Sequence, residues 1–183
     1  MNLIHALFGI CCHQYIDRSP QYSGEIFPAC YRCTGLYLGI ISSYIFLLFK
    51  KRKTFSLNKE TALLLSMFIV PLYIDGFANH FYLWNTPGPL RSITGMLCGI
   101  SLPLFLISIR NNNIDLHHFK KINFFCFIIP AIIGSLFILS LVFMSSSFVF
   151  YALVILTTSG MLLFFSNMLL ALIKLIAKKI NAF

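Results

Sequence analysis

Charged residues are scarce in this 183-residue chain: they make up 10% of the sequence, and only five of them are acidic. A soluble domain carries roughly 25% charged residues, so the composition excludes one. The sequence also lacks a phosphate-binding glycine loop, a serine-nucleophile motif, the paired histidines of metalloproteases and a nucleic-acid-binding module. What remains is 58% hydrophobic, with a mean hydropathy of +0.85. These features indicate an integral membrane protein.

Five apolar stretches approach or exceed the roughly 20 residues that a helix needs to cross a bilayer. Short connections join them, and only helices satisfy their own backbone groups in lipid without closing a barrel. We therefore predict an all-α, polytopic membrane helical bundle with about five transmembrane helices. The predicted spans are 34–49, 61–84, 90–109, 122–144 and 148–176.

The chain is expected to form a single membrane domain over residues 1–183, in which an N-terminal Cys/His segment, 1–33, precedes the bundle, 34–183. Leu3 to Cys12 is an apolar run that is too short to span. It lacks the basic start and the small-residue cleavage site of a signal peptide. We expect it to form a short re-entrant or interfacial helix.

The basic residues predict the orientation of the bundle. Of fourteen lysines and arginines, eleven follow the first, third or fifth span, and only Arg18, Arg32 and Arg91 fall on the other side. This pattern of charges between apolar runs argues against a nucleic-acid partner. By the positive-inside rule the eleven are cytoplasmic. The Cys/His segment of this multi-pass cell-membrane protein then faces the extracytoplasmic side.

The chemistry of the chain is concentrated in two blocks. The first contains Cys12-His13-Gln14, Arg18-Ser19 and Cys30-Tyr31-Arg32-Cys33-Thr34-Gly35, and the second contains Pro71, Asp75-Gly76, Leu90-Arg91, Thr94-Gly95 and Gly99. Together they resemble the signature of a prokaryotic membrane-protein family known as domain of unknown function 2085, over roughly residues 8 to 100. The resemblance implies a multi-span membrane protein with a shared site, and it implies no established reaction.

The cysteines of the first block allow three interpretations. Thiolates and a neutral imidazole are good zinc ligands, so Cys12, His13, Cys30 and Cys33 are candidate ligands for zinc, or for iron. Because neighbouring side chains usually diverge, a three-ligand site with one open position is one form of this hypothesis. The same cysteines suit thiol-disulfide exchange, since Cys-x-x-Cys starts a helix. A disulfide that only fixes the loop is the third interpretation. Cys11, Cys98 and Cys126 are expected to be packing residues.

Asp75 is the strongest single candidate outside the cysteine motif. A carboxylate within a span costs at least about 2.5 kcal/mol, so such residues generally face a polar cavity. Its expected partner is Arg91, His80 or a metal ion. Asp75, His13 and Arg91 are the candidate catalytic residues, with Asp75 or His13 as the acid or base. His80 and Asn79 are expected nearer the membrane surface.

Two spans begin with Thr-Gly-x-x-x-Gly, starting at Thr34 and Thr94. Glycines four apart allow close helix packing. Alternatively, the two helix N-termini and their nearby arginines point at an anion. The candidate substrate-binding residues are Gln14, Arg18, Arg32, Thr34, Gly35, Arg91, Thr94 and Gly95.

The leading functional hypothesis is an extracytoplasmic Cys/His/Asp/Arg pocket that binds zinc and acts on an anionic or lipid-linked substrate. A membrane thiol-disulfide oxidoreductase is the first alternative, distinguished by reversible oxidation of Cys30 and Cys33 and by activity that survives chelation. A small membrane transporter is the second, because the region of Asp75 and Arg91 equally suits a pathway.

Overall fold

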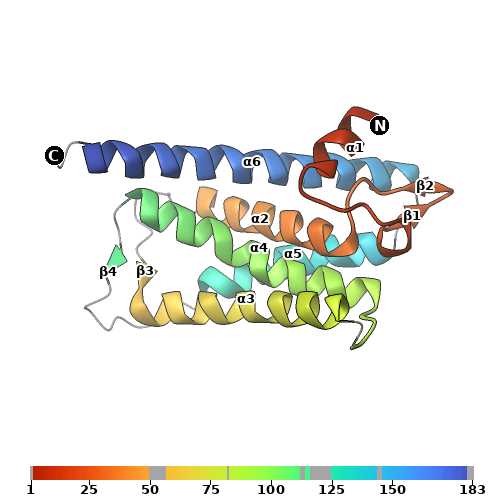
Figure 1. Cartoon of the computed structure of the whole chain (residues 1–183), viewed down its shortest axis with the longest axis horizontal. Helices are drawn as coiled ribbons and strands as arrows, with labels where there is room; N and C mark the ends of the chain where they lie inside the picture. The colour runs from red at the N-terminus through yellow and green to blue at the C-terminus, as the bar shows by residue number, and fades with distance from the viewer. Residues whose placement is uncertain are drawn as a thin grey trace.

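The computed structural model describes residues 2–49, 57–81, 83–111, 114–115, 125–143 and 146–180. Six α-helices dominate these residues (Figure 1). They are α1 (Asn2–Gly9), α2 (Tyr31–Phe49), α3 (Lys59–His80), α4 (Gly88–Asn111), α5 (Phe125–Val142) and α6 (Ser147–Ile180). The remaining elements are the 3-10 helix η1 (Ile16–Arg18) and the two-residue strands β1 (Gln21–Tyr22), β2 (Glu25–Ile26), β3 (Leu57–Asn58) and β4 (Ile114–Asp115).

The helical membrane bundle predicted from the sequence is confirmed. Helices α2, α3, α4 and α6 are each long and apolar enough to cross a membrane. Helix α5 is apolar too, but its apolar stretch, Phe127–Val142, is shorter. At 18 residues α5 extends about 27 Å, close to the roughly 30 Å of a bilayer core. The first span begins at Tyr31 rather than at Thr34, and α3 ends at His80 rather than at Trp84.

Helices α2 and α4 run parallel and touch backbone to backbone along their glycines. A Cβ on Gly35 would collide with the carbonyl oxygen of Ser92, and a Cβ on Gly99 would collide with that of Leu36. Ser43 strengthens the contact because its hydroxyl donates to the carbonyl oxygen of Ile100 at 2.9 Å. Because the helices approach so closely, the residues at their first turns are held side by side.

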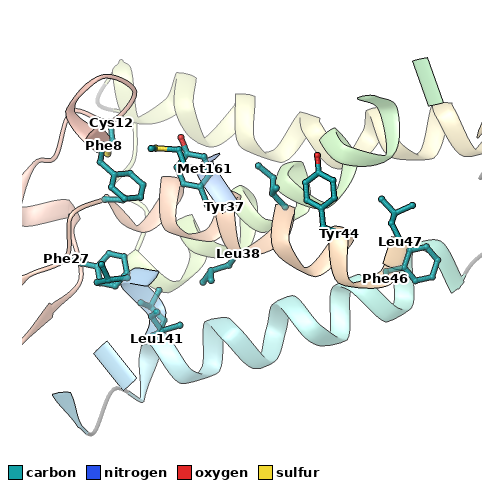
Figure 2. Close-up of a cluster of buried hydrophobic side chains, with 14 of the residues drawn as sticks. Phe8, Cys12, Phe27, Tyr37, Leu38, Tyr44, Phe46, Leu47, Leu141 and Met161 are labelled. Atoms are coloured by element: carbon teal, nitrogen blue, oxygen red, sulfur yellow. The ribbon is translucent and has the colours of Figure 1, made fainter. Parts of the chain in front are cut away.

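Helix α2 forms the centre of the bundle. Its side chains Leu38, Ile40 and Leu47 are fully buried, at 0% exposure, and they belong to a core cluster that reaches every neighbouring helix (Figure 2). In contrast, α3 and α6 carry many exposed apolar residues. Those exposed faces are what a helix presents to lipid tails.

The N-terminal segment covers one end of the bundle. Helix α1 is eight residues long, which agrees with the short helix expected there. Its residue Phe8 packs edge-on against Tyr37 of α2 (Figure 2). Strands β1 and β2 form an antiparallel hairpin around Ser23 and Gly24, both at positive φ, as a tight hairpin turn requires. This hairpin was not predicted from the sequence.

The opposite end carries the parallel pair β3 and β4 and the C-terminus (Figure 1). Helices α2 and α4 end there, and α3 begins there, so the segments that follow the first and third spans share one end. Most of the lysines and arginines used to orient the bundle, including Lys53 and Lys120, lie outside the described residues. The cysteine motif lies at the other end, with α1, β1 and β2.

Candidate functional site

Three cysteines converge where the N-terminal segment meets α2. The sulfur atoms of Cys12, Cys30 and Cys33 all lie within 4.8 Å of one another. Cys12 is 5% exposed, and the other two are partly buried. All three are free thiols. The structure therefore brings together three of the four residues that the sequence suggested as metal ligands.

Local backbone geometry sets this arrangement. Cys30 precedes α2 and Cys33 occupies its first turn, so a Cys-x-x-Cys pair places both sulfurs at one helix end. Cys12 follows α1, and the backbone N–H of Cys30 donates to its sulfur at 3.3 Å. Gln14, at φ +51°, donates its amide hydrogens to the carbonyl oxygens of His5 and Pro28, at 2.7 and 2.8 Å. Gln14 thus fixes the loop that carries Cys12.

The three thiols are electronically unequal. The thiols of Cys30 and Cys33 donate hydrogen bonds to Cys12, which lowers the pKa of Cys12 far below its ordinary value. The same hydrogen bond to Cys12 raises the pKa of Cys30. Together with the backbone N–H of Cys30, which donates to the sulfur of Cys12, these hydrogen bonds favour one thiolate within the cluster. A thiolate is the form of cysteine that binds metals and attacks disulfides.

His13 lies outside the close group of sulfur atoms, although the sequence suggested it as a fourth ligand. The imidazole is exposed, and it stacks on Tyr15 with ring centroids 5.8 Å apart and an interplanar angle of 7°. Its neighbour Cys12 is buried. Both residues line the same cavity, but the imidazole of His13 does not belong to the close group of sulfur atoms.

A cavity of about 140 Å³, the thiol cavity, opens beside the three cysteines. Three arginines that are far apart in the sequence reach it, and among its described lining residues there is no carboxylate. The thiol cavity is lined by Cys11, Cys12, His13, Gln14, Tyr15, Arg18, Cys30, Arg32, Cys33 and Arg91. An enclosed space with this much positive charge attracts an anion.

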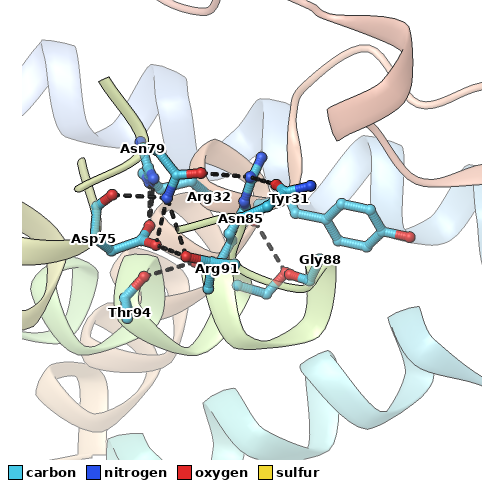
Figure 3. Close-up of polar contacts among 10 residues, drawn as sticks. Tyr31, Arg32, Asp75, Asn79, Asn85, Gly88, Arg91 and Thr94 are labelled. Carbon is cyan, nitrogen blue, oxygen red and sulfur yellow. Dashed lines mark hydrogen bonds and ion pairs between the residues drawn. The ribbon is translucent and has the colours of Figure 1, made fainter. Parts of the chain in front are cut away.

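Asp75 is paired with Arg32 rather than with Arg91 (Figure 3). Arg32 donates to Oδ2 of Asp75 from Nε at 2.8 Å and also from Nη2. Asp75 is 4% exposed, and its Oδ1 accepts from Thr86 and from Asn79. Since both carboxylate oxygens are occupied, the structure gives Asp75 the geometry of a positioning residue for Arg32. An acid or base role is not visible in these contacts.

Arg91 is held by amides instead of a carboxylate (Figure 3). Its Nη2 donates to Oδ1 of Asn79 at 2.6 Å and to Oδ1 of Asn85 at 2.8 Å. Asn79 therefore bridges Asp75 and Arg91; it lies near the end of α3, where the sequence placed it, and is 8% exposed. Arg91 is 6% exposed, and its buried Nε has no hydrogen-bond partner among the described residues. A buried donor without a partner is costly, so Arg91 carries a free-energy penalty at this atom.

Of the threonines and glycines that start the two spans, Thr34, Gly35 and Gly95 serve packing, whereas Thr94 also lines a separate cavity of about 450 Å³ together with Asp75. Gly35 and Gly95 allow backbone contact between α2 and α4, since a Cβ on Gly95 would collide with the carbonyl oxygen of Arg32. Thr34 is fully buried and donates to the carbonyl oxygen of Ala29 at 3.3 Å. Thr94 donates to that of Arg91 at 3.0 Å. These contacts support the packing interpretation, and none of the four residues lines the thiol cavity.

A second, more open space adjoins the thiol cavity. This basic chamber, about 480 Å³, is lined by His13, Tyr15, Asp17, Arg18, Arg32, Gly76, Asn79 and His80. It shares His13, Tyr15, Arg18 and Arg32 with the thiol cavity. Arg18 lies over the ring of Tyr15, 5.3 Å from its centroid, and pairs with exposed Asp17 at 3.6 Å. His80 contributes from the exposed end of α3.

The other cysteines do not belong to the close group of Cys12, Cys30 and Cys33, although Cys11 also lines the thiol cavity. Cys98 is 4% exposed within α4 and is a packing residue, as expected. Cys11 is exposed instead, and its sulfur lies 3.2 Å from the hydroxyl of Tyr37. The expectation of a packed Cys11 was therefore wrong. Cys126 belongs to α5, and its side chain lies outside the described residues.

The fold and the cluster define a class: a helical integral membrane protein with cysteines, arginines and a buried aspartate at one end of its bundle. Residues 12–105 match the family described as predicted membrane protein (DUF2085), and the chain belongs to that family. The resemblance noted from the sequence is thereby confirmed. The matched segment runs from Cys12 into α4 and contains every candidate site residue.

Two curated relatives are described as uncharacterised proteins. A protein of Methanothermobacter thermautotrophicus is 33% identical over 95 residues, which cover 52% of this chain and 83% of the relative. A protein of Methanocaldococcus jannaschii is 28% identical over 107 residues, which cover 58% of this chain and 67% of the relative. No solved structure matches this chain.

Proposed function

We propose that Cys12, Cys30 and Cys33 bind a transition-metal ion, zinc in the first instance, next to arginines that hold an anionic substrate. The observation that carries the proposal is the approach of three sulfurs within 4.8 Å beside a cavity lined by Arg18, Arg32 and Arg91. The cell membrane is the expected location, with this end of the bundle outside. Iron is a second candidate metal.

The donor set fits zinc. With Zn–S bonds of about 2.3 Å, sulfurs at the corners of a tetrahedron lie about 3.8 Å apart. Separations of up to 4.8 Å need only small side-chain adjustments to reach that geometry. Three protein ligands leave a fourth position for water or substrate, and zinc in such a site acts as a Lewis acid.

The surrounding side chains have three proposed roles: binding the anion, positioning Arg32 and transferring a proton. Arg18, Arg32 and Arg91 all line the cavity, so their positive charges would neutralise and orient an oxyanion held there. Asp75 holds the guanidinium of Arg32 through Nε and Nη2. His13, at the edge of the cavity and exposed to solvent, is the group best placed to move a proton.

A thiol-disulfide oxidoreductase is the second candidate, and the lowered pKa of Cys12 favours it. A thiolate next to two thiols is the arrangement required for attack on a disulfide, after which a neighbouring thiol resolves the mixed disulfide. Chelator-resistant activity and a reversible change in thiol number would distinguish this function from the metal site.

One experiment separates the two candidates. Metal content and free thiols are measured on gently purified full-length protein, on the Cys30→Ser/Cys33→Ser variant, and on two controls, His13→Ala and Cys98→Ser. About one zinc or iron per chain is expected, retained in both controls and lost in the double variant. A metal-free protein with two thiols missing from six, restored by reductant, would reject the metal site and favour the oxidoreductase.

A further inference from the structure

An apolar groove runs along the outer face of α3 and ends at the basic chamber. This α3 groove has a volume of about 910 Å³ and is walled by Leu72, Tyr73, Ile74, Phe77, Leu83 and Trp84. Most of these side chains are more than half exposed, for example Tyr73 at 74% and Phe77 at 63%. In a membrane-spanning helix, such a surface is open to the lipid.

The groove and the chamber adjoin each other and share three lining residues. Arg32, Gly76 and His80 line both of them. Arg32 also lines the thiol cavity, so one guanidinium faces all three spaces. A molecule lying in the groove therefore meets the positive charge of Arg32 at the groove's inner edge. The thiol cavity with the cysteines adjoins the same arginine.

The groove reaches from the end of α3 toward the interior of the span. Its α3 residues run from Leu72 to His80, a rise of about 12 Å, and Leu83 and Trp84 follow the helix end. Tyr and Trp are typical of the membrane–water interface. An arginine facing lipid is unfavourable unless its charge is met, and Asp75 occupies only Nε and Nη2 of Arg32.

We propose that the α3 groove binds the apolar chain of an anionic membrane lipid, whose phosphate head group enters the basic chamber past Gly76. The inference rests on the proposed function, because it names the source of the anion that the arginines hold: a phosphate-bearing lipid that enters sideways from the bilayer. The charge complementarity is between one phosphate and the guanidinium groups of Arg18 and Arg32.

Gly76 is the position that tests this path. It lines both spaces, and a Cβ built on it would lie 3.9 Å from Nη1 of Arg32, an ordinary contact. Gly76→Ala should therefore leave the path open. Gly76→Leu places three further carbons at the junction and should close it. Arg18→Gln removes charge from the chamber without touching a membrane helix, and serves if Gly76→Leu fails to fold.

Lipid retention is measured by native mass spectrometry on the full chain, released from nanodiscs containing equal amounts of dioleoyl phosphatidylglycerol and dioleoyl phosphatidylcholine. Wild type and Gly76→Ala should prefer the anionic lipid by about fivefold or more per charge engaged. Gly76→Leu should lose most of that preference, and Arg18→Gln should lower it about fivefold. Soluble glycerol 3-phosphate should not displace the lipid.

Several results would overturn the inference. Equal retention of both lipids would show that the site does not select an anionic head group. Equal lipid retention by Gly76→Leu and Gly76→Ala would show that the lipid does not pass Gly76. Displacement by glycerol 3-phosphate would point to a soluble anion. The lipid measurement is repeated on the Cys30→Ser/Cys33→Ser variant and metal content is measured on Gly76→Leu. Lipid binding without metal, or metal without lipid binding, then shows which proposal has failed.

Discussion

Replacing Asp75 with asparagine tests the ion pair that joins α2 to α3. The carboxylate is 4% exposed and accepts hydrogen bonds from Arg32, Asn79 and Thr86. Asparagine preserves the size of the side chain and removes its charge, so the guanidinium of Arg32 loses its counterion. The protein should therefore lose stability even though no cavity is created.

The expected loss follows from burial. Removing one partner of a fully buried ion pair costs about 3–5 kcal/mol. Because the Arg32 side chain is 29% exposed, its freed charge is partly solvated, and we expect a loss of about 2–3 kcal/mol in the free energy of unfolding. An Arg32→Met/Asp75→Leu double variant removes both charges and should recover about half of that loss or more.

The assay is unfolding of the purified full chain in mixed micelles, titrated with sodium dodecyl sulfate and followed by circular dichroism. Asp17→Asn is the matched control, since Asp17 pairs with Arg18 at the surface, 3.6 Å away, and such pairs contribute about 0–1 kcal/mol. Equal stability of Asp75→Asn and Asp17→Asn would refute a structural role for the ion pair. So would an Arg32→Met/Asp75→Leu variant whose loss in the free energy of unfolding exceeds the sum of the losses caused by Arg32→Met alone and Asp75→Leu alone.

Two further predictions concern packing and orientation. Gly99→Val inserts a side chain against the carbonyl oxygen of Leu36 and should lower the free energy of unfolding by about 1–3 kcal/mol in the same assay. Gly76→Ala is the control and should change the free energy of unfolding little. Equal effects of the two substitutions would contradict the close contact of α2 and α4. Cysteines introduced at Lys53 and Asn112, both outside the described residues, should add no labelling by an impermeant maleimide in intact cells beyond that of the parent protein, whose exposed Cys11 sets the background, whereas Gln21→Cys in the exposed hairpin strand should add labelling. The reverse pattern would place the cysteine cluster in the cytoplasm.

The parts of the site that were predicted from the sequence depend on spacing along one element. Cys30 and Cys33 share a helix end because three residues are nearly one turn, and Gly95 and Gly99 form a smooth strip because four residues are one turn. The span lengths follow from hydropathy alone. Such features need no knowledge of which helices are neighbours.

The partner of Asp75 could not be predicted from the sequence, because it depends on how α3 is rotated against α2 and α4. Arg32 and Arg91 start two parallel helices at the same end of the bundle, and the rotation of α3 decides which of them meets the carboxylate. At 100° per residue, a small rotation changes the outcome. A local signal for Asn79 did exist: Asp75 and Asn79 are four residues apart, hence on one face of α3, where the amide donates to Oδ1 at 2.9 Å. Thr86 and Asn85 carried no such signal, because they lie in the connection between α3 and α4.

The glycine contact between α2 and α4 explains why the site is positively charged. Arg32 precedes Gly35 by three residues and Arg91 precedes Gly95 by four, so packing the glycines together forces both guanidinium groups to the same end of the bundle. Like charges held close together repel. Asp75 neutralises Arg32, but Arg91 receives only the amide oxygens of Asn79 and Asn85. The repulsion is therefore only partly compensated by the described residues.

An anion in the thiol cavity would complete the compensation, and bound thiolates or a phosphate would both serve. The close packing of α2 and α4 thus connects the stability of the bundle with the chemistry proposed at its end.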